Sequence, residues 1–271
     1  MGDMVRSLHL AKASFLSAKR YRIDWYGSFL TPLLTIIPVV LLFYLGSKSG
    51  LVQFFYGATN TENIIGYLLL GAAYWNYVEV LWGTVFTLRY YMRIGQLEEI
   101  LTMPISTLGY IFSWSVFGLV KVTIESVPII VLAILMNFMT LSPIGFALAA
   151  GVVILSIVAS FGFVFLFFGV TLRFKEGDEL VGLLGNAAPL IGGMFFPVSI
   201  LSKGLMYLSF AFPFTWGLDL TRHFLMNTNT LLNPGKEFII LTVLSLLYLG
   251  LGAFSFRVLQ NKARRKGMQG F

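Results

Sequence analysis

Long apolar stretches alternate with short polar segments along almost the whole chain. Six of these stretches have roughly the 17–25 residues that a helix needs to cross the hydrocarbon core of a membrane. The third and fourth are longer, which predicts tilt or extension beyond the membrane. We place the six predicted spans at 26–45, 64–85, 110–136, 144–172, 180–196 and 238–258.

A further apolar stretch, 204–218, is interrupted by Pro213, which lacks a backbone N–H and clashes with the preceding helical turn. We interpret this segment as re-entrant or interfacial, because the run before the proline is too short to cross. The basic residues support six spans. With the N-terminus in the cytoplasm, most of the 19 Lys and Arg residues fall in cytoplasmic segments, as the positive-inside rule expects. A seventh span would place the basic tail, 259–271, outside. Lys48, Lys203, Arg222 and Lys236 remain outside.

The N-terminal segment has apolar residues at helical spacing, with the basic residues mostly off that face. This pattern predicts a helix over 1–25 that lies along the membrane surface, although a cytosolic helix packed on the protein itself would show it too. We therefore expect an all-α polytopic membrane protein with a single domain over 1–271. It comprises this interfacial helix, a six-span core at 26–258 and the tail. The apolar positions of the first helix are Met4, Leu8, Ala11, Phe15 and Ala18.

The composition excludes several classes of protein. Apolar residues make up 57% and charged residues 11% of the chain, where a soluble domain has about 25% charged residues. The absence of cysteine excludes disulfides and thiolate metal sites. The sequence has no phosphate-binding loop and no nucleophile elbow, and neither histidine has a second ligand at metal spacing. We expect no enzyme activity, cofactor or nucleic-acid partner for this chain, so any ATP must bind another polypeptide.

Apart from Arg257, which is the second-last residue of the last predicted span, three charged residues lie within the predicted spans. Lys121 and Glu125 are four residues apart, so one helix face can pair them, whereas Glu79 has no local partner. Charges at this depth are costly and mark ion or proton relays in many membrane proteins. The alternative, which we favour, is a set of structural contacts between spans two and three.

Two polar segments flank the predicted core. Near the outer end, Asp219 and Arg222 are three residues apart, where they could cap a helix, pair with each other or shape an exit gate together with Trp216 and His223. On the inner side, the segment 88–106 combines charged residues with apolar residues at helical spacing, and Pro104 ends the pattern. A short amphipathic helix there would serve as a docking surface or would lie on lipid headgroups.

Three features of the chain together resemble the membrane subunit of ABC-2-type ABC transporters. The first is a surface helix that leads into a proline-containing span, with Pro32 and Pro38. The second is the run Arg93-Ile-Gly95-Gln96-Leu97-Glu98 followed by Met103-Pro104-Ile-Ser106, with Gln96 where the family commonly has Thr. The third is Gly193-Met-Phe-Phe-Pro197, then Phe212-Pro213-Phe-Thr-Trp216, then Asp219-Leu-Thr-Arg222.

This resemblance implies partners and roles that composition does not reveal. The chain would pair with a second permease subunit, most simply a copy of itself, and with two copies of an ATPase subunit that hold ATP and Mg. Residues 88–103 would include the coupling helix that docks on the ATPase, and 197–230 would form re-entrant extracellular helices. The cleft for substrate would lie between the two permeases, lined by spans two and five, in the cytoplasmic membrane. The implied coupling residues are Arg93, Gly95, Gln96, Leu97, Glu98 and Pro104, and the implied gate residues are Pro197, Pro213, Asp219 and Arg222.

The family resemblance favours an exporter, and few charges in the spans favour a hydrophobic or amphiphilic substrate such as a drug or a lipid-like molecule. An alternative is a polysaccharide or lipid-linked glycan, because sugars stack on aromatic rings. A hypothesis of another class is a stand-alone ion-coupled carrier or channel that uses the intramembrane charges. Candidate stacking residues are Tyr74, Trp75, Tyr77 and Trp82, which could equally be interfacial anchors.

Overall fold

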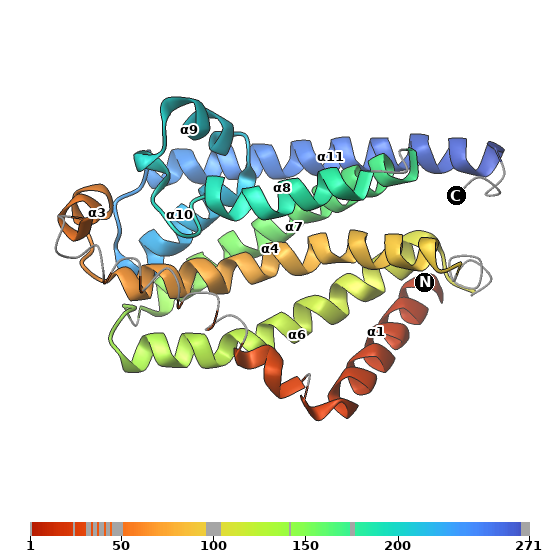
Figure 1. Cartoon of the computed structure of the whole chain (residues 1–271), viewed down its shortest axis with the longest axis horizontal. Helices are drawn as coiled ribbons and strands as arrows, with labels where there is room; N and C mark the ends of the chain where they lie inside the picture. Colours follow the sequence, from red (N-terminus) through yellow and green to blue (C-terminus); the bar gives the residue numbers. More distant parts are fainter. Residues whose placement is uncertain are drawn as a thin grey trace.

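Long helices that run side by side form the body of the protein (Figure 1). The computed structural model describes residues 2–23, 25–30, 34, 37, 41, 44, 51–95, 104–140, 142–173 and 177–266. This part of the chain is all-helical and contains no strand. Its elements are α1 (Gly2–Arg20), α3 (Leu51–Thr59), α4 (Ile64–Arg93), α6 (Thr107–Leu135), α7 (Pro143–Arg173), α8 (Gly177–Ile191), the 3-10 helix η2 (Val198–Ile200), α9 (Lys203–Phe210), α10 (Pro213–Met226) and α11 (Pro234–Lys266).

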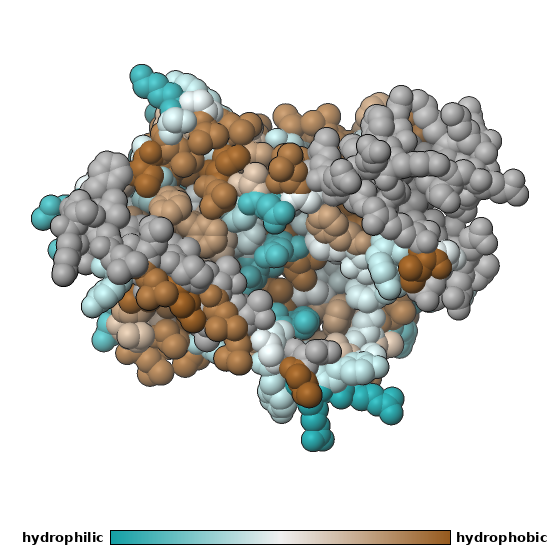
Figure 2. Space-filling view, in the orientation of Figure 1, coloured by the Kyte–Doolittle hydropathy of each residue, from teal (hydrophilic) through white to brown (hydrophobic). Residues whose placement is uncertain are grey.

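Four of these helices are long and apolar enough to cross a membrane, which identifies a membrane-protein architecture. The stretches are Ile64–Thr87, Leu108–Leu135, Pro143–Phe167 and Pro234–Val258, and they correspond to four of the six predicted spans. Both chain termini lie at one end of this bundle, and α3, α9 and α10 lie at the other (Figure 1). Apolar side chains cover much of its coloured surface (Figure 2).

The other two predicted spans are not among these four long helices. The first, 26–45, falls mostly outside the described residues. The fifth coincides with α8, but this helix has 15 residues and ends at Ile191, five residues before the predicted end. A helix of that length measures about 22 Å, shorter than a hydrocarbon core of about 30 Å. The chain turns after α8 because Gly193 adopts a positive φ of 87°, a conformation that favours glycine.

The segment around Pro213 forms two short helices instead of one long one, as its interruption predicts. Pro213 occupies the first turn of α10, where its missing N–H costs no helical bond. The ring nitrogen of Trp216 donates to the carbonyl of Phe210 over 2.9 Å and holds α9 against α10. Helix α10 is largely buried, with Phe214 and Leu218 both 2% exposed, so it packs inside the bundle at the end away from the termini.

Aromatic rings fill the core between α4, α7 and α10. The Trp82 ring lies 5.5 Å from Phe163 and 5.8 Å from Phe214, between ring centroids, and Trp75 meets Phe214 edge-on at 5.2 Å. Edge-to-face and tilted pairs at these distances stabilise packed aromatic cores. Three of the candidate stacking residues therefore belong to the core: Tyr74, Trp75 and Trp82 are 3–4% exposed.

Helices α7 and α11 approach each other backbone to backbone. A side-chain carbon at Gly252 would collide with the carbonyl of Gly162, and one at Gly162 would collide with the backbone of Tyr248. Small residues allow this close packing in membrane helices. The Ser245 hydroxyl reaches across to the Leu155 carbonyl at 3.2 Å. Helix α11 continues to Lys266, so the predicted tail at 259–271 begins within a helix.

The N-terminal helix packs partly on the protein itself. Ser7 and Ala11 are 1% and 5% exposed and face α6, whereas Met4 and Leu8 are 62% and 46% exposed. The predicted apolar face is therefore divided, because docking on α6 uses the small side chains and leaves the larger apolar ones outward. The larger apolar side chains of α1 therefore stay exposed.

Candidate coupling and gating sites

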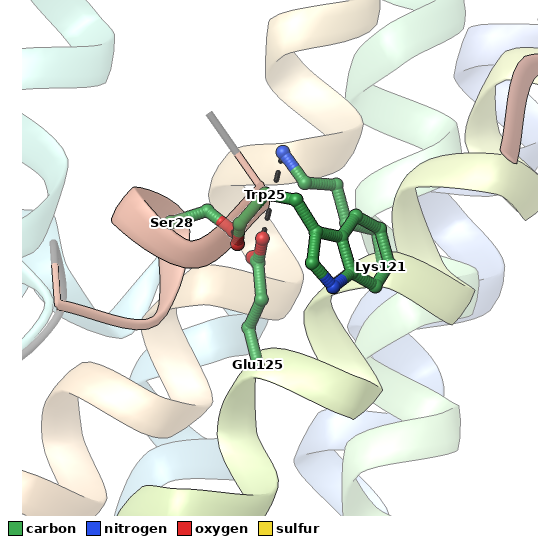
Figure 3. Close-up of polar contacts among 4 residues, drawn as sticks. All are labelled: Trp25, Ser28, Lys121 and Glu125. Carbon is green, nitrogen blue, oxygen red and sulfur yellow. Dashed lines mark hydrogen bonds and ion pairs between the residues drawn. The ribbon is translucent and has the colours of Figure 1, made fainter. Parts of the chain in front are cut away.

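The intramembrane ion pair forms as the sequence spacing predicts. Lys121 Nζ lies 3.4 Å from Glu125 Oε1 on α6, and the Glu125 residue is 8% exposed. Figure 3 shows Trp25 and Ser28, from the segment after α1, beside this pair. Glu79 is exposed on α4 and takes no part in the contact. A paired lysine and glutamate are neutral as a unit, which suits a water-poor environment.

Among the described residues, Arg222 is an extensively bonded charged side chain at the end of the bundle where the sequence predicts the outer gate. It is 2% exposed, and Nη1 donates to the Gly193 carbonyl at 2.7 Å while Nη2 donates to the Met194 carbonyl at 2.7 Å. Nε and Nη2 also donate to the Tyr67 carbonyl, at 3.2 and 3.0 Å. The guanidinium carbon lies 3.4 Å from the centre of the Tyr67 ring. This side chain therefore joins α10 to α4 and to the turn after α8, and we call it the outer clamp.

The clamp needs Gly71 on α4. A side-chain carbon at this position would collide with Arg222 Nη2 and with the Met194 carbonyl. The carbonyls that follow α8 lie near the negative end of the helix dipole, which favours a cation there. A buried arginine requires such partners because it stays charged. Pattern analysis missed Gly71 because a glycine within an apolar helix gives no local sign of its distant contact.

Asp219 belongs to a separate network. Its Oδ2 accepts from the Leu231 N–H at 2.8 Å, and burial raises the pKa of this carboxyl. Glu237, at the start of α11, accepts from the Leu232 N–H at 2.6 Å and is 0% exposed. Asp219 and Arg222 thus bond to different backbone groups: Asp219 to the loop before α11, and Arg222 to α4 and to the turn after α8. Sequence reasoning did not single out Glu237, which resembles an ordinary acidic residue in a first helical turn.

The remaining residues of the predicted gate are only partly brought together. Pro197 and Asp219 line one cavity of about 180 Å³, which Tyr67 and Asn229 also line. His223 Nδ1 lies 2.8 Å from the Thr228 carbonyl and supports the turn that ends α10. Pro213 is at the other end of α10, and Pro197 precedes η2. The outer site is therefore a set of helix ends joined by hydrogen bonds.

The C-terminal end of α4 is where the predicted coupling segment begins. Residues 88–93 continue α4, which ends at Arg93, and Gly95 turns the chain with a φ of 76°. Glycine in this conformation is common after a helix C-terminus. Gln96, Leu97 and Glu98 lie outside the described residues, and Pro104 follows them at the entry to α6.

Helix α1 docks directly beside the exit of this loop. Asp3 accepts from Ser106 twice, from the backbone N–H at 3.0 Å and from the hydroxyl at 2.5 Å. These bonds lower the pKa of Asp3. The Ser106 oxygen in turn caps α6 by accepting from the Gly109 N–H at 2.9 Å, and Arg6 donates to the Pro104 carbonyl at 2.7 Å. We call this set of contacts the inner clasp, and Asp3 and Ser106 are positions that sequence reasoning missed.

Among the described residues, no three His, Cys, Asp or Glu side chains gather in a way that could hold a metal ion. The polar groups at both ends of the bundle instead bond to backbone atoms. The chemistry of these sites is therefore that of helix positioning. No model of a known protein family matches the chain, and no curated protein matches it in sequence.

Proposed function

We propose that this chain is the permease subunit of an ATP-driven exporter of the ABC-2 type, with a hydrophobic or amphiphilic substrate. In this proposal the chain has six spans, with 26–45 and α8 completing the four long helices. Two copies pair in the cytoplasmic membrane with both termini inside. Two ATPase subunits supply ATP and Mg and dock on the loop between α4 and α6.

One observation carries the proposal: α4 links the two ends of the molecule. Its outer end offers the Tyr67 carbonyl to the outer clamp, and its inner end leads through Gly95 into the loop that precedes the inner clasp. The helix has 30 residues and measures about 45 Å. A rigid element of this length transmits a displacement at one end to the other, which is what alternating access driven from a partner chain requires.

The packing favours an apolar substrate over a glycan. Trp75 and Trp82 are buried by other rings and offer no free face to a sugar, and Tyr74 is only 3% exposed. Tyr77 is partly exposed, and its hydroxyl donates to Thr123 at 3.3 Å. A single partly exposed ring of this set is a poor platform for stacking several sugar units.

The test is transport in proteoliposomes, with the chain reconstituted with and without the ATPase encoded beside its gene. We expect ATP-dependent movement of a lipophilic cationic dye only when both are present. An ATPase variant that binds but does not hydrolyse ATP is the matched control. Dye movement by the chain alone, driven by an ion gradient, would refute the proposal and favour the carrier hypothesis, for which the Lys121–Glu125 pair is the supporting observation.

A further inference from the structure

An apolar cavity of about 350 Å³ lies between α4, α6, α7 and α10, apart from the outer clamp and the inner clasp. Its inner wall is buried: Leu70, Ala149 and Leu225 are 4–5% exposed. Its rim contains exposed residues, including Ile154, which is 62% exposed. The volume falls within the range of about 300–1,000 Å³ that is typical of small-molecule sites. The cavity is therefore large enough to hold a ligand and open enough to admit one.

The cavity opens at a depth where a membrane would surround it. Ala149 and Ile154 lie within the apolar stretch Pro143–Phe167 of α7, about 9–17 Å along the axis from its start. The neighbouring exposed side chains Val127 and Leu148 are apolar. A molecule that reaches this rim comes from the hydrocarbon phase. Among the described residues that line the cavity none is charged, which selects an uncharged ligand.

One hydroxyl in the wall has no partner. Ser126 is 0% exposed, lines the cavity, and its Oγ makes no hydrogen bond within the described structure. The other hydroxyls of the wall all donate a hydrogen bond. Tyr74 donates to the Ser156 hydroxyl and Tyr77 to the Thr123 hydroxyl. Thr123 donates to the Leu119 carbonyl and Thr221 to the Gly217 carbonyl. A buried polar group without a partner costs about 1–3 kcal/mol. A ligand with one hydrogen-bonding group would remove this cost.

Helix α6 lacks one backbone hydrogen bond beside the cavity. Pro128 lies inside α6, two residues from Ser126, and has no N–H to give the carbonyl of Ile124. A proline at this place weakens the regular helix beside the cavity. The cavity wall therefore includes a turn of α6 that lacks one of its backbone hydrogen bonds.

We propose that this cavity binds an uncharged, membrane-soluble aromatic molecule with a single hydrogen-bonding group, which enters from the lipid side and bonds to Ser126. The site belongs to this chain alone. It therefore does not depend on the proposed pairing with an ATPase, and its test does not require one. Binding here would place an amphiphile between helices of one subunit, away from a cleft between two subunits.

The test uses the full chain in lipid nanodiscs with 1-aminoanthracene, an uncharged aromatic amine whose fluorescence rises in apolar surroundings. We expect saturable binding beyond that of empty nanodiscs. Its photoreactive analogue 1-azidoanthracene should label peptides of α6 and α7 that line the cavity, and excess 1-aminoanthracene should prevent this labelling.

Three variants distinguish binding in the cavity from nonspecific partitioning of the dye into the lipid. Ala150→Phe fills the rim from an exposed position and should abolish saturable binding. Ser126→Ala removes the free hydroxyl and should weaken binding about three- to tenfold. Ala147→Phe makes the same change at an exposed position of α7 outside the cavity and should bind as the unaltered chain does. Size-exclusion profiles verify that each variant is folded.

Several results would overturn the inference. Saturable binding that survives Ala150→Phe, or labelling confined to α8 or α11, would place the ligand elsewhere. Uptake that never exceeds that of empty nanodiscs would remove the site altogether. Unchanged affinity in Ser126→Ala would refute the assigned hydrogen bond.

Discussion

The outer clamp offers the sharpest test of how this bundle is held together. Replacing Arg222 with Met keeps an unbranched side chain but removes every donor. The carbonyls of Tyr67, Gly193 and Met194 then lose their bonds to the guanidinium. In a site that is 2% exposed, water cannot easily replace those bonds. The clamp should therefore contribute more to stability than a surface charge does.

The expected loss follows from the contacts. Each of the three carbonyls that loses its bond to the guanidinium costs about 1 kcal/mol at the lower end of the usual range. The cation–π contact with Tyr67 adds about 1 kcal/mol, and the relief of not burying a charge offsets part of the sum. A net loss of about 3 kcal/mol lowers the melting temperature of a chain this size by roughly 6–12 °C.

The assay is the thermal unfolding of the purified chain in detergent, followed by fluorescence-detected size-exclusion chromatography. Arg222→Lys should give an intermediate result, because an ammonium cannot reach all three carbonyls with fixed geometry. Lys203→Met removes an exposed cation from α9 and is the matched control. If Arg222→Met melts with the unaltered chain, the clamp is not a stabilising element and the reasoning fails.

Three further predictions concern the inner clasp, the α7–α11 contact and the ion pair. The bonds that lower the pKa of Asp3 stabilise the docking of α1 at neutral pH, and this stability is lost as pH falls through the pKa of the folded state. Limited proteolysis of α1 should therefore accelerate in acid, and Asp3→Asn should be cleaved rapidly at every pH. Gly252→Ala, which forces α11 away from α7, should reduce stability by about 1–3 kcal/mol, whereas Gly250→Ala, which meets open space, should not, as thermal unfolding will show. Glu125→Gln, which leaves Lys121 unpaired, should lower stability while ATP-driven transport continues in proteoliposomes.

Each of these predictions has a clear contrary outcome. Proteolysis of α1 that ignores pH would mean that the clasp does not hold the helix. Equal melting of the two glycine variants would mean that the helices separate at no cost. Loss of all transport in the glutamate variant, with normal assembly, would assign the ion pair to a relay and support the carrier hypothesis.

Sequence patterns could predict those structural features that depend on residues close together in the chain. The length of the apolar runs identified α4, α6, α7 and α11, because a helix needs about 20 residues to cross the hydrocarbon core. The missing N–H of Pro213 predicted the break between α9 and α10. The spacing of Lys121 and Glu125 predicted their contact. All of these depend on chain geometry within a few residues.

The end of α8 was less predictable from composition alone. The apolar run continues through Phe196, so hydropathy extends the span beyond Ile191. The turn at Gly193 ends the helix instead, and its carbonyl becomes a partner of Arg222. Hydropathy measures the preference for an apolar environment and carries no information about where a backbone bends.

The sequence by itself determined that this is a helical membrane protein, which of its segments are long apolar helices, and which neighbours along one helix meet. Only the tertiary structure decided that Arg222, which hydropathy places among the outer loop cations, is a buried clamp. Its partners lie 28 to 155 residues away, and Asp3 lies 103 residues from Ser106. Hydrophobic periodicity describes how a segment relates to its surroundings. Which carbonyl or helix end a polar side chain bonds to depends instead on how helices that are distant in the sequence pack together.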